Sequence, residues 1–220
     1  MRSLDLSLRP PPERTPEVFA ILADSPALAS ARLHEWNPAA DESLTAFFVC
    51  DGDRGPVVEG LAASPLVLDV EASPFGEERF GLLVRLERGA DPFVERVFEA
   101  VTSAGLIVGK PVVYREGRVR ARLLGTDETL AAVLDRIPDA VSVTVEAIRA
   151  LEKDPRAGFW ALPPRQREAL RTAVDLGYYE QPRRATHEDV ARALGCSSST
   201  ASEHLQKAAA RLVRAAVAGG

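Results

Sequence analysis

Residues 186–208, THEDVARALGCSSSTASEHLQKA, constrain the fold most, because they specify two helices and the break between them. Thr186 is followed three residues later by Asp189, the spacing of a capping box that starts a helix over EDVARAL. Gly195 is suited to end that helix in the left-handed conformation, and Ser197 is suited to cap the next one. The segment therefore predicts a short helix, a tight turn and a longer helix.

Another helix is expected before this pair. Pro164 suits the first turn of a helix through RQREALRTAVDL, and Gly177 can end it. Its apolar stripe is expected to consist of Leu162, Ala169, Leu170, Ala173, Val174 and Leu176. Three helices, the last two joined by a glycine-containing turn, predict a helix-turn-helix domain.

The third predicted helix, SSTASEHLQKAAARLVRAAV, separates into faces. Its apolar stripe consists of Ala201, Leu205, Ala208 and Leu212. Short uncharged side chains lie beside that stripe near the helix start: Ser198, Ser199, Ser202 and Gln206. Such groups read base edges in the major groove, and a glutamine can pair bidentately with adenine. The alternative is a solvated polar face on an ordinary three-helix bundle.

The expected DNA contacts combine phosphate positioning with base reading. They are Arg183, Arg184, Thr186, Ser197, Ser198, Ser199, Thr200, Ser202, Glu203, Gln206 and Lys207. The two arginines and the start of the second helix are placed near phosphates, where they would position the protein. Residues 160–220 contain 9 Lys or Arg and 6 Asp or Glu, against 18 and 26 in residues 1–159. This basic tail on an acidic body favours a nucleic-acid partner for the tail.

The pattern of residues 1–150 repeats once. Strand and helix signals follow the order β-α-β-β-α-β twice, from SLDLSLR to LVLDVEA and from ERFGLLVRLE to AVSVTVEAI. The predicted fold class is α+β, a tandem ferredoxin-like body followed by an all-α domain. The boundaries are 1–152 for the body, with repeats of about 1–74 and 75–152, then a linker at 153–160 and the helix-turn-helix domain at 161–220. One continuous eight-stranded sheet is an alternative that the sequence leaves open.

Catalytic and metal-binding patterns are weak in this sequence. There is no phosphate-binding glycine loop, GxSxG or HExxH motif, and the two cysteines, Cys50 and Cys196, are far apart. His34 beside Glu35 is interpreted as a surface histidine, and CDGDRG as a turn. We therefore predict no catalytic residue, metal or cofactor, and no cofactor-binding site is assigned. No apolar run is long enough to span a membrane, and the N-terminus does not resemble a signal peptide.

The tail also resembles a known family. LPPRQREALRTAVDLGYYEQPRRATHEDVARALGCSSSTASEHLQKAAARLV is similar to the helix-turn-helix domain of the haloarchaeal bacterio-opsin activator family. The most specific elements are RQREAL, GYYEQPRRAT, DVARALG and STASEHLQKA in that order; Pro163 replaces the usual threonine before the first helix. The resemblance implies an archaeal transcription regulator whose body is similar to the domain that often precedes this tail.

The leading hypothesis is a cytoplasmic, sequence-specific regulator that binds double-stranded DNA as a homodimer. Its body would sense a small-molecule effector, dimerise or contact another protein, with the basal transcription machinery as a candidate partner. One alternative gives the body oligomerisation and protein contacts alone. Another is an enzyme of small-molecule metabolism whose helical tail mediates assembly. A deep pocket with convergent polar groups would favour sensing, whereas perturbed titratable pairs would favour catalysis.

Overall fold

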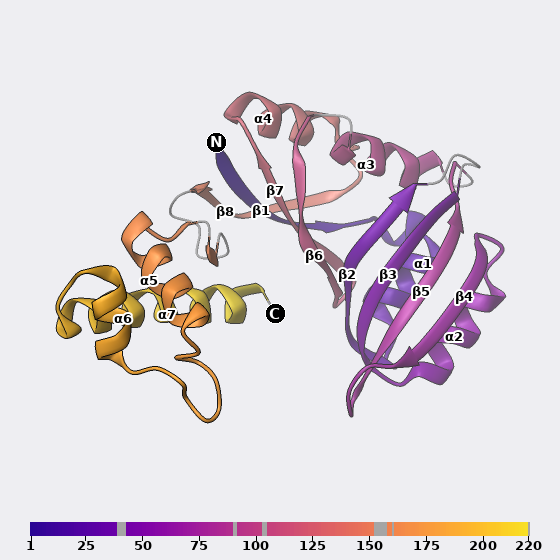
Figure 1. The fold of residues 1–220 in the computed structure, drawn as a ribbon. Helices are drawn as coiled ribbons and strands as arrows, with labels where there is room; N and C mark the ends of the chain where they lie inside the picture. Colours follow the sequence, from indigo (N-terminus) through magenta and orange to yellow (C-terminus); the bar gives the residue numbers. More distant parts are fainter. Residues whose placement is uncertain (39–42, 90–91, 103–104, 152–157, 160, 220) are drawn as a thin grey trace. The chain divides into compact units, whose positions relative to one another are not determined.

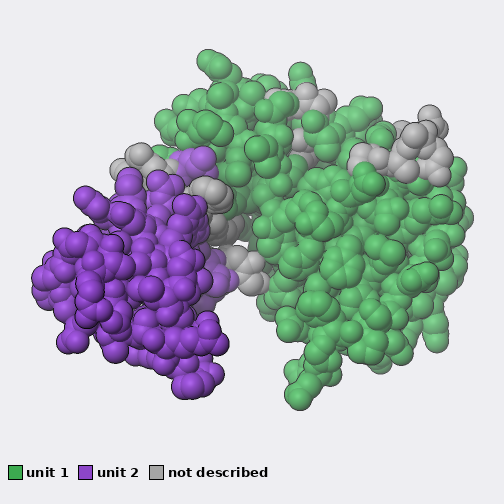
Figure 2. Space-filling model, in the orientation of Figure 1, with its two compact units in different colours: residues 1–150 green, residues 151–220 purple. Residues whose placement is uncertain are grey.

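The chain divides into two compact units, residues 1–150 and 151–220 (Figure 2). The computed structural model describes residues 1–38, 43–89, 92–102, 105–151, 158–159 and 161–219. Most of the predicted linker, 153–160, lies outside these residues. In the ranges that are described, no helix combines the length and the apolar character needed to cross a membrane.

The described residues of unit 1 form eight strands and four α-helices in the predicted order (Figure 1). The strands are β1 (Arg2–Arg9), β2 (Leu28–Pro38), β3 (Ser43–Gly52), β4 (Val67–Pro74), β5 (Arg79–Glu87), β6 (Ile107–Arg115), β7 (Arg118–Gly125) and β8 (Ser142–Ala150). The helices are η1 (Pro12–Arg14, a 3-10 turn), α1 (Glu17–Asp24), α2 (Arg54–Ala63), α3 (Pro92–Thr102) and α4 (Asp127–Arg136). Unit 2 contains α5 (Pro164–Asp175), α6 (His187–Leu194) and α7 (Ser198–Gly219).

All eight strands belong to one antiparallel sheet in the order β4-β5-β3-β2-β6-β7-β1-β8. The structure thus has the continuous sheet that the sequence left as an alternative. Within the described part of the sheet, its two halves, β4-β5-β3-β2 and β6-β7-β1-β8, are hydrogen-bonded to each other where β2 pairs with β6. That junction consists of the pairs Ala31↔Tyr114, Arg32↔Val113 and Leu33↔Val112.

The predicted repeats, 1–74 and 75–152, do not form two self-contained units, because their first strands are exchanged. β1 belongs to the first repeat but pairs with β7 and β8 of the second. β5 belongs to the second repeat but pairs with β3 and β4 of the first. Each half of the sheet therefore takes an interior strand from the other repeat, and a tandem of two self-contained ferredoxin-like units is not confirmed.

Helices cover one face of both halves (Figure 1), and the apolar layer beneath them is continuous. Residues of α1 and α2 such as Leu22 and Leu61 pack with Phe48 and Leu82 of the first half. Leu130 and Val133 of α4 pack instead with Leu4, Leu6 and Leu123 of the second half. Three partly buried residues contact both clusters: Val108, Val119 and Ala121. Burial of this shared layer holds the two halves together.

The exchange of strands predicts that neither repeat folds alone. A chain cut between Gly76 and Glu77, in the exposed connection from β4 to β5, should give fragments 1–76 and 77–150 that each lack a cooperative urea transition. Each fragment would leave the backbone groups of two strands without the strand between them. Mixed and refolded together, the fragments should recover the circular dichroism spectrum of intact residues 1–150. Cooperative unfolding of either fragment by itself would contradict the observed pairing.

Candidate nucleic-acid interface

Helix α5 packs through small side chains onto the rest of unit 2. Ala169 and Ala173 are fully buried, and Gln166 is 8% exposed. The predicted stripe is wrong at its end, because Val174 is 58% exposed and Leu176 is 38% exposed. The amide oxygen of Gln166 accepts a hydrogen bond of 3.3 Å from Arg211 of α7, so a polar contact also joins these two helices.

The segment between α5 and α6 is fixed around Tyr178. Its ring is buried, and its hydroxyl is 2.8 Å from Nε2 of His187, the first residue of α6. The guanidinium of Arg183 lies 4.7 Å from the centre of the same ring. Arg184 forms an ion pair of 2.6 Å with Glu180. Both expected phosphate contacts are thus exposed and held near the start of α6, and the buried tyrosine that orders this segment was missed in the sequence.

Helix α6 begins with the predicted capping box. The Thr186 hydroxyl accepts a hydrogen bond from the backbone N–H of Asp189, and the Asp189 carboxylate accepts one of 2.9 Å from the backbone N–H of Thr186. Hydrogen bonds from the backbone and side chain of Thr186, then from Arg192, lower the pKa of Asp189 to about 2. The Thr186 hydroxyl therefore serves the helix cap, and a contact through its side chain would compete with that role.

The break between α6 and α7 follows the predicted chemistry. Gly195 ends α6 in the left-handed conformation with φ of 64°, which most other residues adopt only at a cost. Ser197 then caps α7, because its hydroxyl accepts a hydrogen bond of 3.2 Å from the backbone N–H of Thr200. The same hydroxyl lies 2.9 Å from that of Ser199 and 2.8 Å from that of Thr200. The Ser197 hydroxyl is thus the centre of the hydroxyl contacts at the helix start.

Helix α7 carries the remaining predicted contacts at exposed and half-buried positions around its buried stripe. Three residues of its predicted stripe, Ala201, Leu205 and Ala208, are each at most 3% exposed, whereas Leu212 at the end of the stripe is only half-buried. The side chains of Ser198, Ser202 and Gln206 make no hydrogen bond to another described residue, whereas Glu203 and Lys207 form an ion pair with each other. Hydroxyl, amide and backbone groups are thus available beside the buried stripe, where a recognition helix carries its base-reading residues.

Three packed helices with this turn define a helix-turn-helix protein, and comparison with known families agrees. A family model described as an HTH DNA binding domain matches residues 162–214. A second model, HVO_0513_N, which represents N-terminal domains, matches residues 17–150. The chain belongs to this HVO_0513_N family and carries an HTH DNA-binding domain after the family domain.

Two proteins of Haloferax volcanii resemble the chain. The transcriptional regulator NarO is 48% identical over 52 residues, which make up 24% of this chain and 25% of NarO. The second, provisionally described as a transcriptional regulator, is 40% identical over 184 residues, or 79% of this chain and 30% of that protein. The chain thus spans between a quarter and a third of the length of these relatives.

Acid should weaken the start of α6 at a predictable pH. Because the pKa of Asp189 is lowered to about 2 from an unfolded value of about 4, its contribution to stability is complete above about pH 4 and is lost as the pH falls toward 2. We expect Asp189→Asn to remove this part of the acid dependence when unfolding of full-length protein is followed by circular dichroism from pH 5 to 2. Glu188→Gln, at the neighbouring exposed position, is the matched control and should leave the acid profile of the parent. Identical profiles for the parent and Asp189→Asn would contradict the assignment.

Proposed function

We propose that this protein regulates transcription by binding specific double-stranded DNA sequences, with α7 in the major groove. The proposal rests on two kinds of polar side chain near the start of α7, one that caps the helix and others that remain available for a ligand. Ser197 is used for capping, whereas Ser198, Ser202 and Gln206 are exposed or half-buried and have no hydrogen-bond partner in the part of the chain that the structure describes. Serine is short enough to let the helix backbone approach the bases, and Gln206 supplies the donor and acceptor needed for adenine.

The remaining contacts are proposed to position the protein. The N-terminus of α6, at Thr186, would place the positive end of the helix dipole near a phosphate. Arg183 and Arg184 flank that end, and a phosphate would compete with Glu180 for the Arg184 guanidinium. Ser199, Thr200, Glu203 and Lys207 would contact the backbone or the edge of the groove, with the Glu203–Lys207 pair opening on contact with DNA.

The narrower identity we propose is an archaeal regulator of the bacterio-opsin activator type, acting in the cytoplasm. The helix-turn-helix resemblance and the haloarchaeal relatives support this assignment. Unit 1 would control unit 2 by sensing a small-molecule effector or by dimerising, and the basal transcription machinery is a candidate partner. No observation favours the enzyme alternative; burial raises the pKa of the Cys50 thiol to about 12, which makes it a poor nucleophile.

A homodimer is expected, because one recognition helix reads only a few base pairs. The end of α7 offers a contact surface, since Val213 is 61% exposed and Val217, one turn later, is 77% exposed. Light scattering should give twice the chain mass at micromolar concentration. Val213→Lys combined with Val217→Lys should give the monomer mass, and Arg214→Gln in the same turn should leave the dimer intact. A monomeric parent protein, both free and on DNA, would contradict the proposal.

Mutations can separate the residues proposed to contact phosphates from those proposed to contact base edges. Ser202→Ala or Gln206→Ala should cost about 1–3 kcal/mol on the native site and less on random DNA, because base-edge contacts are lost. Arg184→Ala should weaken binding to all sequences alike and reduce the slope of log affinity against log salt by about one. Fluorescence anisotropy at several salt concentrations measures both quantities.

The control for this comparison is Arg165→Ala. Arg165 is an exposed arginine of α5 in an ion pair with Glu168, comparable with the pair formed by Arg184. Arg165→Ala should change neither the ratio of affinities for the native site and random DNA nor the slope of log affinity against log salt. If Arg184→Ala altered the preferred sequence while Gln206→Ala and Ser202→Ala left specificity unchanged, the proposed orientation of α7 would be wrong.

A further inference from the structure

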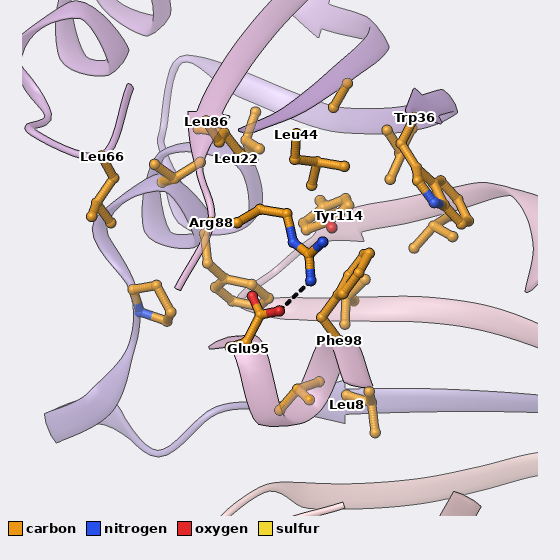
Figure 3. Close-up of a pocket in the computed structure, with 18 of the residues that line it drawn as sticks. Leu8, Leu22, Trp36, Leu44, Leu66, Leu86, Arg88, Glu95, Phe98 and Tyr114 are labelled. Carbon is orange, nitrogen blue, oxygen red and sulfur yellow. Dashed lines mark hydrogen bonds and ion pairs between the residues drawn. The ribbon is translucent and has the colours of Figure 1, made fainter. Parts of the chain in front are cut away.

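Unit 1 contains an apolar cleft on the helix-covered side of the sheet, where the two halves meet (Figure 3). Its volume is about 310 Å³, and residues of α1, α3 and both halves of the sheet line it, among them Phe19, Leu44, Phe48, Leu86, Phe98 and Tyr114. Protein interiors rarely leave an apolar space much larger than a water molecule. This volume lies at the lower end of the range for small-molecule sites.

Few polar groups face this cleft, and they come from different elements. Arg88 follows β5 and forms an ion pair with Glu95 of α3, and its guanidinium lies 5.1 Å from the centre of the Phe98 ring. Figure 3 shows the Arg88 side chain reaching into the cleft, with its guanidinium directed toward Glu95 and Phe98. Among the described residues, the buried Nε of Arg88 has no hydrogen-bond partner. A buried donor in this state favours an incoming acceptor.

Tyr114 supplies a second polar group in the cleft wall. Its ring packs edge-on against Phe19 and Phe48, with centres 5.9 Å and 5.8 Å away. Burial raises the pKa of Tyr114 to about 12, so the hydroxyl keeps its proton and can donate a hydrogen bond. Arg88 and Tyr114 thus place two donors among apolar side chains.

The charges favour a neutral occupant over an anion. Glu95 already neutralises Arg88, and a second carboxylate, Glu87, also lines the cleft. An anionic ligand would have to displace Glu95 from Arg88 in a partly desolvated site. A peptide segment is also a poor fit, because its backbone groups each need a partner and the walls offer few.

We propose that this cleft binds a neutral, largely apolar small molecule of about two fused rings, with one carbonyl-type acceptor directed at Arg88 and Tyr114. The ligand would be the effector through which unit 1 acts, so the biological role of the site rests on the proposed regulatory function. Binding itself needs neither DNA nor unit 2. The two proposals can therefore fail separately.

The test uses the full-length chain without DNA and three fluorescent probes. Prodan is a neutral naphthalene ketone, N-phenyl-1-naphthylamine is neutral without a carbonyl, and 2-naphthoate is anionic. Prodan should bind saturably, one per chain, with blue-shifted emission. Naphthoate should bind at least about tenfold more weakly, because it must compete with Glu95. Failure of Prodan and the amine to bind, or tighter binding of naphthoate, would overturn the proposal.

Variants locate the probe and identify the donor. Arg88→Met should lower the affinity for Prodan about three- to tenfold, the loss expected for one hydrogen bond. It should not lower the affinity for N-phenyl-1-naphthylamine, which has no carbonyl. Arg85→Met, at an exposed arginine of β5 that does not line the cleft, is the matched control and should bind both probes as the parent does. Leu44→Trp fills part of the cleft and should weaken both probes at least about tenfold.

Folding is checked by urea unfolding of each variant. If Arg88→Met is destabilised because Glu95 loses its partner, the double variant Arg88→Met with Glu95→Gln replaces it and should show the same loss for Prodan. If Arg85→Met lost as much Prodan affinity as Arg88→Met, or if Leu44→Trp lost none, the probe would bind elsewhere and the assignment would be overturned. A protein that binds Prodan in this pattern but no specific DNA would support the ligand site and contradict the proposed regulatory function. A protein that binds specific DNA but not Prodan would support the regulatory function and contradict the ligand site.

Discussion

The fold of unit 1 depends on the need of two interior strands, β1 and β5, for backbone partners on both edges. β1 is buried along both faces from Ser3 to Leu8, and its N–H and C=O groups are satisfied by β7 on one side and β8 on the other. β5 occupies the equivalent place between β3 and β4. Because each strand comes from the opposite repeat, the two repeats cannot separate without exposing the edges of these strands. Each repeat therefore supplies an interior strand to the half of the sheet that the other repeat forms.

This exchange also accounts for the position of the cleft. The halves are joined by the exchanged strands and by the short β2–β6 junction, which leaves room on the helix-covered face between α1 and α3. Lys110 of β6 reinforces the junction by pairing with Glu35 and by lying 4.9 Å from the centre of the Trp36 ring. A ligand between the halves would contact both at once, so its binding energy would act on the arrangement of β2 and β6.

Much of this organisation could be predicted from the sequence, and the failures have physical reasons. The eight strands and the helices of unit 1 follow from local periodicity, and the α6 capping box and Gly195 follow from cap chemistry. Strand exchange could not be predicted, because SLDLSLR and FGLLVRL are both apolar strands of similar length and either could fill either interior place. The cleft was missed for a related reason, since Arg88 and Tyr114 are far apart in the sequence and meet only through the sheet order.

The hydroxyl cluster at the start of α7 shows where residue type alone stops predicting a role. The sequence places five hydroxyls between Ser197 and Ser202, and all were expected at DNA. In the structure the Ser197 hydroxyl lies within hydrogen-bond distance of the hydroxyls of Ser199 and Thr200 and caps the first turn of the helix. The side chains of Ser198 and Ser202 make no hydrogen bond to another described residue and keep their hydrogen-bonding capacity. Helix capping and the proposed base contacts therefore both use hydroxyl groups at adjacent positions. The place of each residue around the helix axis decides which of the two roles its hydroxyl can take. A substitution that removed the Ser197 cap is consequently expected to weaken the base contacts proposed for Ser198 and Ser202, because the cap orders the first turn of α7.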